Sequence, residues 1–301
     1  MQEEISVPIS SYPVYSFSFD EARMQWTITK EQSVGEALQE RYQESSKTTL
    51  RSWIAQGRVW VGAESCRKME HKLIPGDLLV IDKKRQFLWN GIEILYQDEH
   101  IIVIYKPAGL LSVATDDGVE DHAHACLKRA IPRRTIYPVH RLDRDVSGVL
   151  VFAFSPQAEE GLKEQFAAHT SKREYRAIVE GVIDEERGTW DSYLCEEENC
   201  YVHSVRDPAK GKLAITHYEV LKRSSKYSVL CVHLETGRKN QIRVHAAEAG
   251  FPIVGDRKYG AKSDFHGRIA LQAYQLCIEH PIIHRAMTFT RRVDEVFLIV
   301  P

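Results

Sequence analysis

Long apolar runs are missing from this 301-residue chain. The longest one, Val149–Phe154, has six residues, whereas a membrane-spanning helix needs about 20. Residues 1–20 lack a basic stretch followed by an apolar one, so we expect no secretory signal, no membrane contact and a cytoplasmic location. A hydrophobic fraction of 43% and a charged fraction of 27% are typical of globular proteins, and the length suits about two domains.

Cysteine is also scarce, with six residues and no CxxC pair. This usage excludes a disulfide framework and favours reduced thiols. Cys195, Cys200 and His203 are close enough in sequence to share a metal ion. Their spacing is unlike that of zinc sites and no fourth ligand is evident, so we expect no metal.

Neither sign of charge is in excess, because 40 Lys and Arg face 42 Asp and Glu, a net charge of −2. The distribution is less even. Residues 47–85 carry nine basic side chains against four acidic ones, and residues 128–144 carry six against one. Basic stripes of this kind suit a protein that contacts phosphate along defined faces, although solvated surfaces produce the same pattern.

A small domain is expected over residues 31–82, after an N-terminal extension of residues 1–30. Ser33 and Glu36 have the spacing of a capping box, which marks the start of a helix. Apolar residues then recur every four positions over residues 34–42, as they do along one face of a helix.

A second short helix follows in this domain and ends at Gly57. Residues 58–61 alternate like a strand, and the turn at 75–77 leads into a second strand at 78–81. The order helix–helix–strand–turn–strand, with the stretches LRSWIAQGRVWV and LIPGDLLVI, resembles the ribosomal protein S-four-like RNA-binding domain. The resemblance implies that basic residues around the second helix contact the RNA backbone. These residues are Lys47, Arg51 and Arg58. A small packed appendage without RNA contacts is the alternative.

A larger domain is expected over residues 92–301, beyond a linker at 83–91. Many short apolar strands arrive singly or in hairpins, the last at 295–300, with helices at 156–169 and 240–249. This pattern predicts an α+β fold with a mainly antiparallel, mixed sheet.

The segment HRLDRDVSG, residues 140–148, places two carboxylates and two guanidinium groups directly before an apolar strand. Nearby positive charge lowers the pKa of a carboxylic acid, so we expect Asp143 to be ionised and to serve as a nucleophile or an electrostatic partner. A glycoside hydrolase would need its carboxylates on opposite sides of a sugar, which suits Asp143 and Asp145 poorly. By itself the segment leaves a charged surface loop and a functional site open.

Three further motifs accompany this segment: KPAG at 106–109, TGRKNQIRVH at 236–245 and PIVGDRKYG at 252–260. In this order they resemble the RluA-type pseudouridine synthases over residues 92–281. The resemblance implies that the chain isomerises uridine in RNA to pseudouridine, in a catalytic domain whose helices surround a central RNA-binding cleft. It implies no metal and no cofactor.

The resemblance also implies roles for individual residues. Asp143 matches the catalytic aspartate that attacks the anomeric carbon, and Arg243 matches the arginine that pairs with it. Tyr175 matches a tyrosine that stacks on the base and helps to move a proton. Arg141 matches the residue that fills the gap left when the uridine flips out, a step that costs a few kcal/mol. Further RNA contacts are expected from Arg144, Arg238 and Gln241.

Departures from the family pattern occur at 239–240, where Lys-Asn replaces Thr-His, at Val146, where Thr is usual, and at Gln272, where His is usual. They put the RNA contacts in question and leave the catalytic residues intact. We expect large-subunit ribosomal RNA as the substrate, with transfer RNA as second choice, and a monomeric protein. A catalytically idle RNA-binding or ribosome-assembly factor on the same scaffold is the alternative from another class.

Overall fold

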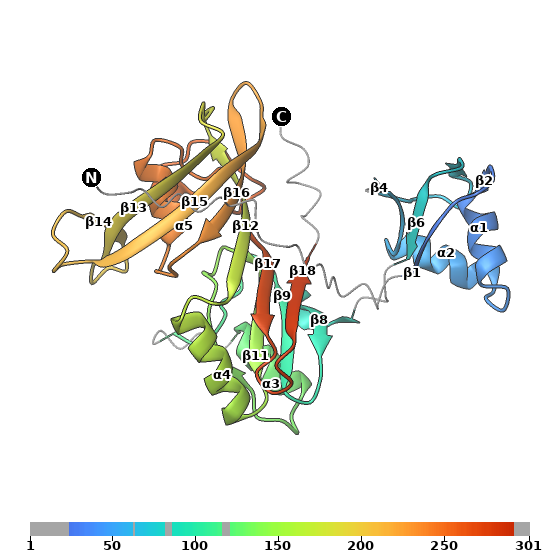
Figure 1. Cartoon of the computed structure of the whole chain (residues 1–301), viewed down its shortest axis with the longest axis horizontal. Coiled ribbons are helices and arrows are strands. Elements are labelled where there is room, and N and C mark those ends of the chain that lie inside the picture. Colours follow the sequence, from blue (N-terminus) through green and yellow to red (C-terminus); the bar gives the residue numbers. More distant parts are fainter. Residues whose placement is uncertain (1–23, 63, 82–85, 116–120, 292–301) are drawn as a thin grey trace, which may run out of the picture.

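The chain forms two parts with separate hydrophobic cores (Figure 1). It is described by a computed structural model that covers residues 24–62, 64–81, 86–115 and 121–291. The smaller part lies at the N-terminus and the larger one holds a 12-stranded sheet. This architecture confirms the predicted α+β fold.

The small part combines a four-stranded antiparallel sheet, a two-stranded ribbon and two helices. The sheet has the order β1 (Met24–Thr27), β6 (Leu78–Ile81), β3 (Val59–Val61) and β4 (Glu64–Ser65), and the ribbon pairs β2 (Gln32–Ser33) with β5 (Lys72–Leu73). The helices are α1 (Val34–Arg41) and α2 (Lys47–Ala55), both of which the sequence predicts.

The ends of these two helices follow from local chemistry. At the start of α1, the Ser33 hydroxyl accepts a hydrogen bond from the Glu36 amide, and the Glu36 carboxylate accepts one from the Ser33 amide at 2.7 Å. This is the predicted capping box. After α2, Gly57 has φ of +67°, a left-handed conformation that favours glycine and ends the helix.

The small part begins earlier than residue 31. Strand β1 pairs with β6 in the register Met24↔Ile81, and Ile28 is buried in the same core as the two helices. The prediction that residues 24–30 belong to an extension is therefore wrong. Its cause is that a short edge strand gains its stability from pairing with a segment some 50 residues away, which local sequence does not reveal. Residues 1–23 lie outside the described part of the chain.

The predicted linker at 83–91 is also shorter than expected. Strand β7 (Gln86–Phe87) pairs with β8 (Glu93–Gln97) at the edge of the large sheet, and a short 3-10 helix (Trp89–Gly91) connects them. Residues 82–85 lie outside the described ranges.

The large sheet has the order β14-β13-β15-β16-β12-β17-β11-β9-β8-β7, with β10 beside β11 and β18 beside β17. Its remaining strands are β9 (Ile101–Lys106), β10 (Tyr137–Pro138), β11 (Ser147–Ala153), β12 (Lys172–Glu180), β13 (Arg187–Glu196), β14 (Val202–Val205), β15 (Lys212–Arg223), β16 (Tyr227–Leu234), β17 (Leu271–Glu279) and β18 (Ala286–Thr290). Among the described strands, only β11 and β17 pair in parallel. The strand predicted at 295–300 lies outside the described residues.

Three α-helices accompany this sheet: α3 (Ala123–Ala130), α4 (Pro156–Ala167) and α5 (Gln241–Glu248). The last two confirm predicted helices, whereas the sequence did not reveal α3. Helix α4 packs on β11 and β17, and α5 packs on β13 and β15. Within the described ranges, no helix combines the length and the apolar character that crossing a membrane requires.

The parallel pair β11–β17 depends on a glycine. Gly148 has φ of +141°, and a Cβ at this position would lie 2.3 Å from the carbonyl oxygen of Ala273. Such an approach excludes any side chain. Strand β17 therefore contacts β11 on one side and β12 on the other, which brings the segment before β11 close to β12.

Candidate active site

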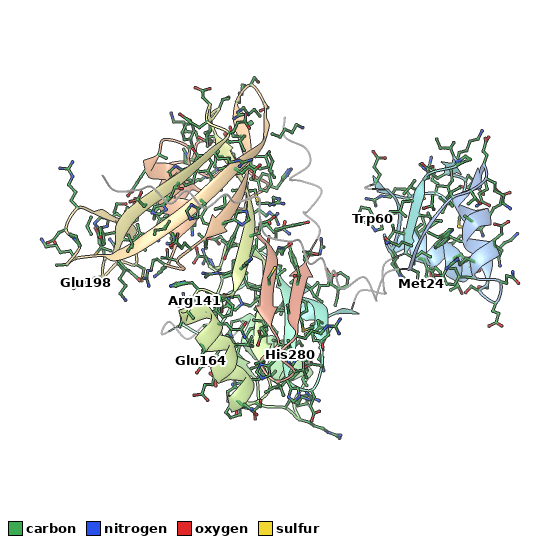
Figure 2. All side chains as sticks on the ribbon, viewed as in Figure 1. Met24, Trp60, Arg141, Glu164, Glu198 and His280 are labelled. Carbon is green, nitrogen blue, oxygen red and sulfur yellow. The ribbon has the colours of Figure 1, made fainter. Side chains whose placement is uncertain are left out.

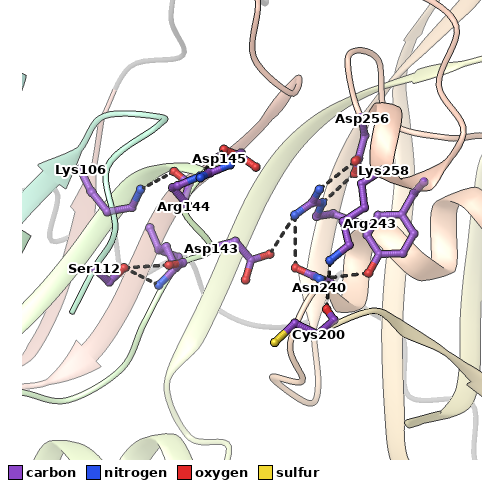
Figure 3. Close-up of polar contacts among 12 residues, drawn as sticks. Lys106, Ser112, Asp143, Arg144, Asp145, Cys200, Asn240, Arg243, Asp256 and Lys258 are labelled. Carbon is purple, nitrogen blue, oxygen red and sulfur yellow. Dashed lines mark hydrogen bonds and ion pairs between the residues drawn. The ribbon is translucent and has the colours of Figure 1, made fainter. Parts of the chain in front are cut away.

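Residues from three distant segments meet in one cavity of about 70 Å³. Asp143 lies on the loop between β10 and β11, Tyr175 on β12 and Arg243 in the first turn of α5. The same cavity is lined by three more of the predicted residues: Arg141, Arg238 and Gln241. The carboxylate of Asp143 and the guanidinium of Arg243 point toward each other from opposite walls (Figure 3).

Hydrogen bonds with Ser112 and Lys106 fix the loop that carries Asp143. The Ser112 hydroxyl donates to the carbonyl of Leu142 at 2.8 Å and accepts from the Leu142 amide at 3.0 Å. Lys106, at the end of β9, donates to the carbonyl of Arg144 at 3.1 Å and to two carbonyls of its own turn, those of Pro107 and Leu110. The backbone on both sides of Asp143 is thus fixed.

Lys106 is fully buried, and sequence reasoning identified it only as part of a turn. Burial lowers the pKa of its ammonium group to about 7, against the opposing effect of Asp143 and Asp145. The sequence did contain a signal for this burial. Lys106 is the last residue of a strand that is otherwise apolar, and such a strand lies in the interior along its whole length.

Arg243 forms its shortest hydrogen bonds with Asp256. Its Nε and Nη2 donate to the two carboxylate oxygens of Asp256 at 2.7 and 2.8 Å, and Asp256 is 1% exposed. The remaining nitrogen, Nη1, donates to Asn240 Oδ1 at 3.2 Å and lies 3.8 Å from Asp143 Oδ2. Burial alone would lower the pKa of Arg243, but its hydrogen bonds to Asp256 and the charges of Asp256 and Asp143 raise it. The guanidinium therefore stays charged and keeps one edge toward Asp143.

Asn240 and Tyr259 complete this support. The Asn240 amide donates to the Tyr259 hydroxyl at 3.0 Å, and the Arg243 guanidinium lies 5.1 Å from the centre of the Tyr259 ring. Asn240 has φ of +55°, a conformation that asparagine tolerates better than most residues. The sequence flagged Asn240 only as a departure from the family pattern.

The pKa of Asp143 differs in direction from the sequence expectation. Burial raises it, and the charges of Arg243, Arg141 and Lys106 only oppose this effect, while Asp145 adds to it. The expectation that flanking arginines hold this pKa low is wrong, because it counted neighbouring charges and missed the removal of water.

Tyr175 is 8% exposed and faces the same cavity. Burial raises the pKa of its hydroxyl, and the nearby Asp143 adds to the shift. The hydroxyl is therefore protonated at neutral pH.

Gln241 does not have a free group for RNA. Its Nε2 donates to the Ile215 carbonyl and to Thr216 Oγ1, both at 2.9 Å. Its Oε1 accepts from Thr236 Oγ1 at 2.7 Å and from the Arg238 amide at 2.9 Å. Since both donors and both acceptor positions of the amide are used, the predicted RNA contact of Gln241 is wrong; the residue fixes the turn before α5.

The predicted arginines separate into two groups. Arg144 does not line the cavity and pairs with Asp145 at 3.2 Å. Arg141 and Arg238 are exposed at the rim of the cavity, and Arg238 Nε donates to the Leu213 carbonyl at 3.0 Å. Figure 2 shows Arg141 beside the lower half of the large sheet.

In the small part, Lys47 and Arg51 lie one turn apart on α2 and line a cavity of about 860 Å³. Arg58 lies elsewhere, with its guanidinium 4.8 Å from the centre of the Trp53 ring. Of the three residues, Lys47 and Arg51 line this cavity and Arg58 does not.

Metal-ligand types converge at a different place from the one the sequence suggested. Within the described part of the chain, the group whose ligand atoms lie within 4.8 Å of one another is Glu174, Cys231 and His233. Arg176 occupies this cluster, since it pairs with Glu174 and donates to the Cys231 thiol at 2.9 Å. Cys195, Cys200 and His203 form no such group.

Comparison with known proteins identifies the family. The family model described as RNA pseudouridylate synthase matches residues 100–248. Ribosomal large subunit pseudouridine synthase D of Pseudomonas aeruginosa is 34% identical over an alignment of 283 positions, which covers 85% of this chain and 87% of that protein. The chain belongs to the RNA pseudouridylate synthase family. It is thus an enzyme that isomerises uridine in RNA.

Other members of the pseudouridylate synthase family agree with this placement. The dual-specificity RNA pseudouridine synthase RluA of Haemophilus influenzae is 36% identical and covers 67% of this chain and 94% of its own length. The solved structures titled human RNA pseudouridylate synthase domain containing 4 and domain containing 1 have TM-scores of 0.55 and 0.57 at 23% and 22% identity. They cover 68% and 67% of this chain and 90% and 84% of their own. They support the fold.

Proposed function

We propose that this enzyme acts on large-subunit ribosomal RNA and that Asp143 is its nucleophile. The role of Asp143 is supported by the position of its carboxylate, which shares one cavity with Tyr175 and Arg243 and lies 3.8 Å from the Arg243 guanidinium. The choice of substrate is supported by the Pseudomonas aeruginosa relative, a ribosomal large subunit pseudouridine synthase whose match covers 85% of this chain. Transfer RNA is the second choice.

In the proposed reaction the target uridine leaves the RNA stack, because a stacked nucleotide cannot reach a carboxylate inside the cavity. Asp143 attacks the anomeric carbon of the ribose, and the bond from that carbon to N1 of uracil breaks with its electrons on N1. The uracil rotates in place, and its C5 attacks the anomeric carbon and releases Asp143. The proton on C5 is then lost and N1 gains one, so that atoms and charge balance without a cofactor.

The other residues of the cavity assist this sequence. Arg243, oriented by Asp256, presents one edge to Asp143 and stabilises its ionised form. Tyr175 stacks on the uracil ring, and its protonated hydroxyl takes part in moving the proton from C5 to N1. Arg141, exposed at the rim, enters the gap that the flipped uridine leaves in the RNA.

Two further surfaces of the protein bind the RNA beyond the target uridine. Arg243 and Asp145 also border a second cavity, of about 760 Å³, which has room for a neighbouring nucleotide. On the small part, Lys47 and Arg51 add contacts to phosphates, which contribute affinity more than sequence selection. Residues 24–81 then form an RNA-binding domain and residues from 86 onward the catalytic domain.

The test is pseudouridine mapping of total RNA from cells that lack the gene. The cells are complemented with wild type, Asp143→Ala or the control Asp121→Ala, an exposed carboxylate that lines neither cavity. Restoration by wild type and the control, but not by Asp143→Ala, supports the proposal and names the RNA. Restoration by Asp143→Ala would remove the nucleophile from the proposal, and sites in transfer RNA would move the substrate to the second choice. Identical maps in all strains would overturn the proposed substrate.

A further inference from the structure

Arg173 lies in the wall of the active-site cavity without a role in the reaction above. It precedes Tyr175 by two residues on β12, and alternate residues of a strand face the same side. Both side chains therefore line the cavity that holds Asp143. The two residues influence each other electrostatically, since the charge of Arg173 lowers the pKa of the Tyr175 hydroxyl against the larger effect of burial.

The guanidinium of Arg173 has no polar partner among the described residues. Its Nε is buried and donates to nothing, and no carboxylate lies within ion-pair distance of it in these ranges. Its contacts are the Phe166 ring, 5.7 Å away, and the backbone at Gly237, where a Cβ would lie 2.5 Å from Nη1. Because buried donors in folded proteins are nearly always satisfied, and Arg173 lines the cavity, we take its guanidinium to be available to a ligand that enters there.

The charge balance of the cavity shows which ligand would suit it. Arg141, Arg173 and Arg238 line it, whereas Asp143 is its only described acidic residue. Arg243 adds little net charge because its ion pair with Asp256 neutralises it. The excess is positive, and a guanidinium presents paired donors that match the oxygens of a phosphate group.

We propose that Arg173 binds a backbone phosphate of the RNA next to the uridine in the cavity. This inference rests on the proposed function, because it assumes that RNA enters here. Gly237 belongs to the site, since a side chain at that position would push the guanidinium from its place. Arg173 is thus an RNA-binding residue that fixes the position of the ribose relative to Asp143.

The experiment compares two variants. Arg173→Met keeps the unbranched aliphatic stem and removes the charge, and Arg173→Lys keeps the charge. Lys163→Met is the matched control, an exposed cation on α4 that does not line the cavity. Binding of an unmodified large-subunit ribosomal RNA transcript is measured over a range of salt concentrations, together with pseudouridine formation in a single turnover.

We expect Arg173→Met to weaken binding about 10-fold at low salt and to reduce the slope of log affinity against log salt by about 0.7–0.9, the change for one phosphate contact. Arg173→Lys restores most of the slope, and Lys163→Met leaves affinity within about 2-fold. A second variant, Gly237→Ala, should weaken binding in the wild-type background and have no further effect in Arg173→Met.

An unchanged slope in Arg173→Met overturns the proposal, whether turnover falls or not, since a contact to the base or to Asp143 releases no counterion. Equal losses in Arg173→Met and Arg173→Lys also overturn it, because they indicate packing. Failure of the proposed function is visible separately. In that case wild type and Asp143→Ala form equally little pseudouridine, while the salt slopes still report on Arg173.

Discussion

Arg243 donates to both carboxylate oxygens of Asp256 at 2.7 and 2.8 Å, whereas its approach to Asp143 is 3.8 Å. The arginine that the family resemblance assigns to the catalytic aspartate is therefore oriented by a different aspartate. Asp256 is 1% exposed, so this ion pair is largely shielded from water, while Asp143 keeps access to the cavity. A substrate can thus reach Asp143 without disturbing the position of Arg243.

Removal of Asp256 should destabilise the protein. Asp256→Ala leaves the buried Arg243 without its main partner, which costs about 3–5 kcal/mol of unfolding free energy. Asp145→Ala removes the partner of the exposed Arg144 and should cost less than about 1 kcal/mol. Urea denaturation of both variants measures the difference. A similar small loss in the two variants would show that Arg243 finds another partner.

The rate of isomerisation should fall in acid as Asp143 takes up a proton. Because burial raises the pKa of Asp143, the fall begins at a higher pH than for an exposed aspartate. Arg141 opposes this shift and Asp145 adds to it, so Arg141→Gln should move the acid limb to higher pH and Asp145→Asn to lower pH. Single-turnover rates as a function of pH measure both. Shifts of the same sign would contradict the assignment of the limb to Asp143.

Stability should depend on pH through Lys106. Its pKa is about 7 in the folded protein because of burial and 10.5 in the unfolded chain. Between these values the unfolded state binds more protons than the folded one, so the unfolding free energy rises with pH from about 7 to about 10. Below pH 7 both states are protonated and this contribution is constant. Lys106→Met should remove the rise, which urea denaturation at several pH values can follow; an unchanged pH dependence would place it on another group.

Gly148 should not accept even a methyl group. In Gly148→Ala the new Cβ meets the Ala273 carbonyl at 2.3 Å, and both atoms belong to the paired strands β11 and β17. We expect a loss of about 3 kcal/mol or more. Gly250→Ala is the matched control, since Gly250 has φ of +87° with no atom within 4 Å, and the left-handed conformation alone costs about 1–2 kcal/mol. Equal losses in thermal denaturation would mean that the strands separate easily.

The sequence predicted those features that depend on neighbouring residues. The capping box of α1, the end of α2 at Gly57 and helices α4 and α5 are visible in local patterns, and the family motifs identified Asp143, Tyr175 and Arg243. Features that depend on distant segments were missed or misjudged. Strand β1 needs β6 to form, the amide of Gln241 is satisfied by residues of β15, and the pKa of Asp143 is governed by burial under other segments.

The RNA-binding role of the small part remains a prediction. The family model begins at residue 100, so it does not extend over α2. Basic side chains on a short helix have the same appearance on an RNA-binding surface and on an ordinary solvated one.

Strand β17 lies between β11, which follows the Asp143 loop, and β12, which carries Tyr175. The ribosome makes residues 271–279 more than 90 residues after Tyr175. A nascent chain therefore contains Asp143 and Tyr175 before the strand that joins their segments has been made. Until β17 inserts, the two are on separate pieces of sheet. We therefore expect catalytic competence to be acquired near the end of translation, and a chain cut short before β17 to carry the motifs at 106–109, 140–148, 236–245 and 252–260 without the strand that joins Asp143 and Tyr175.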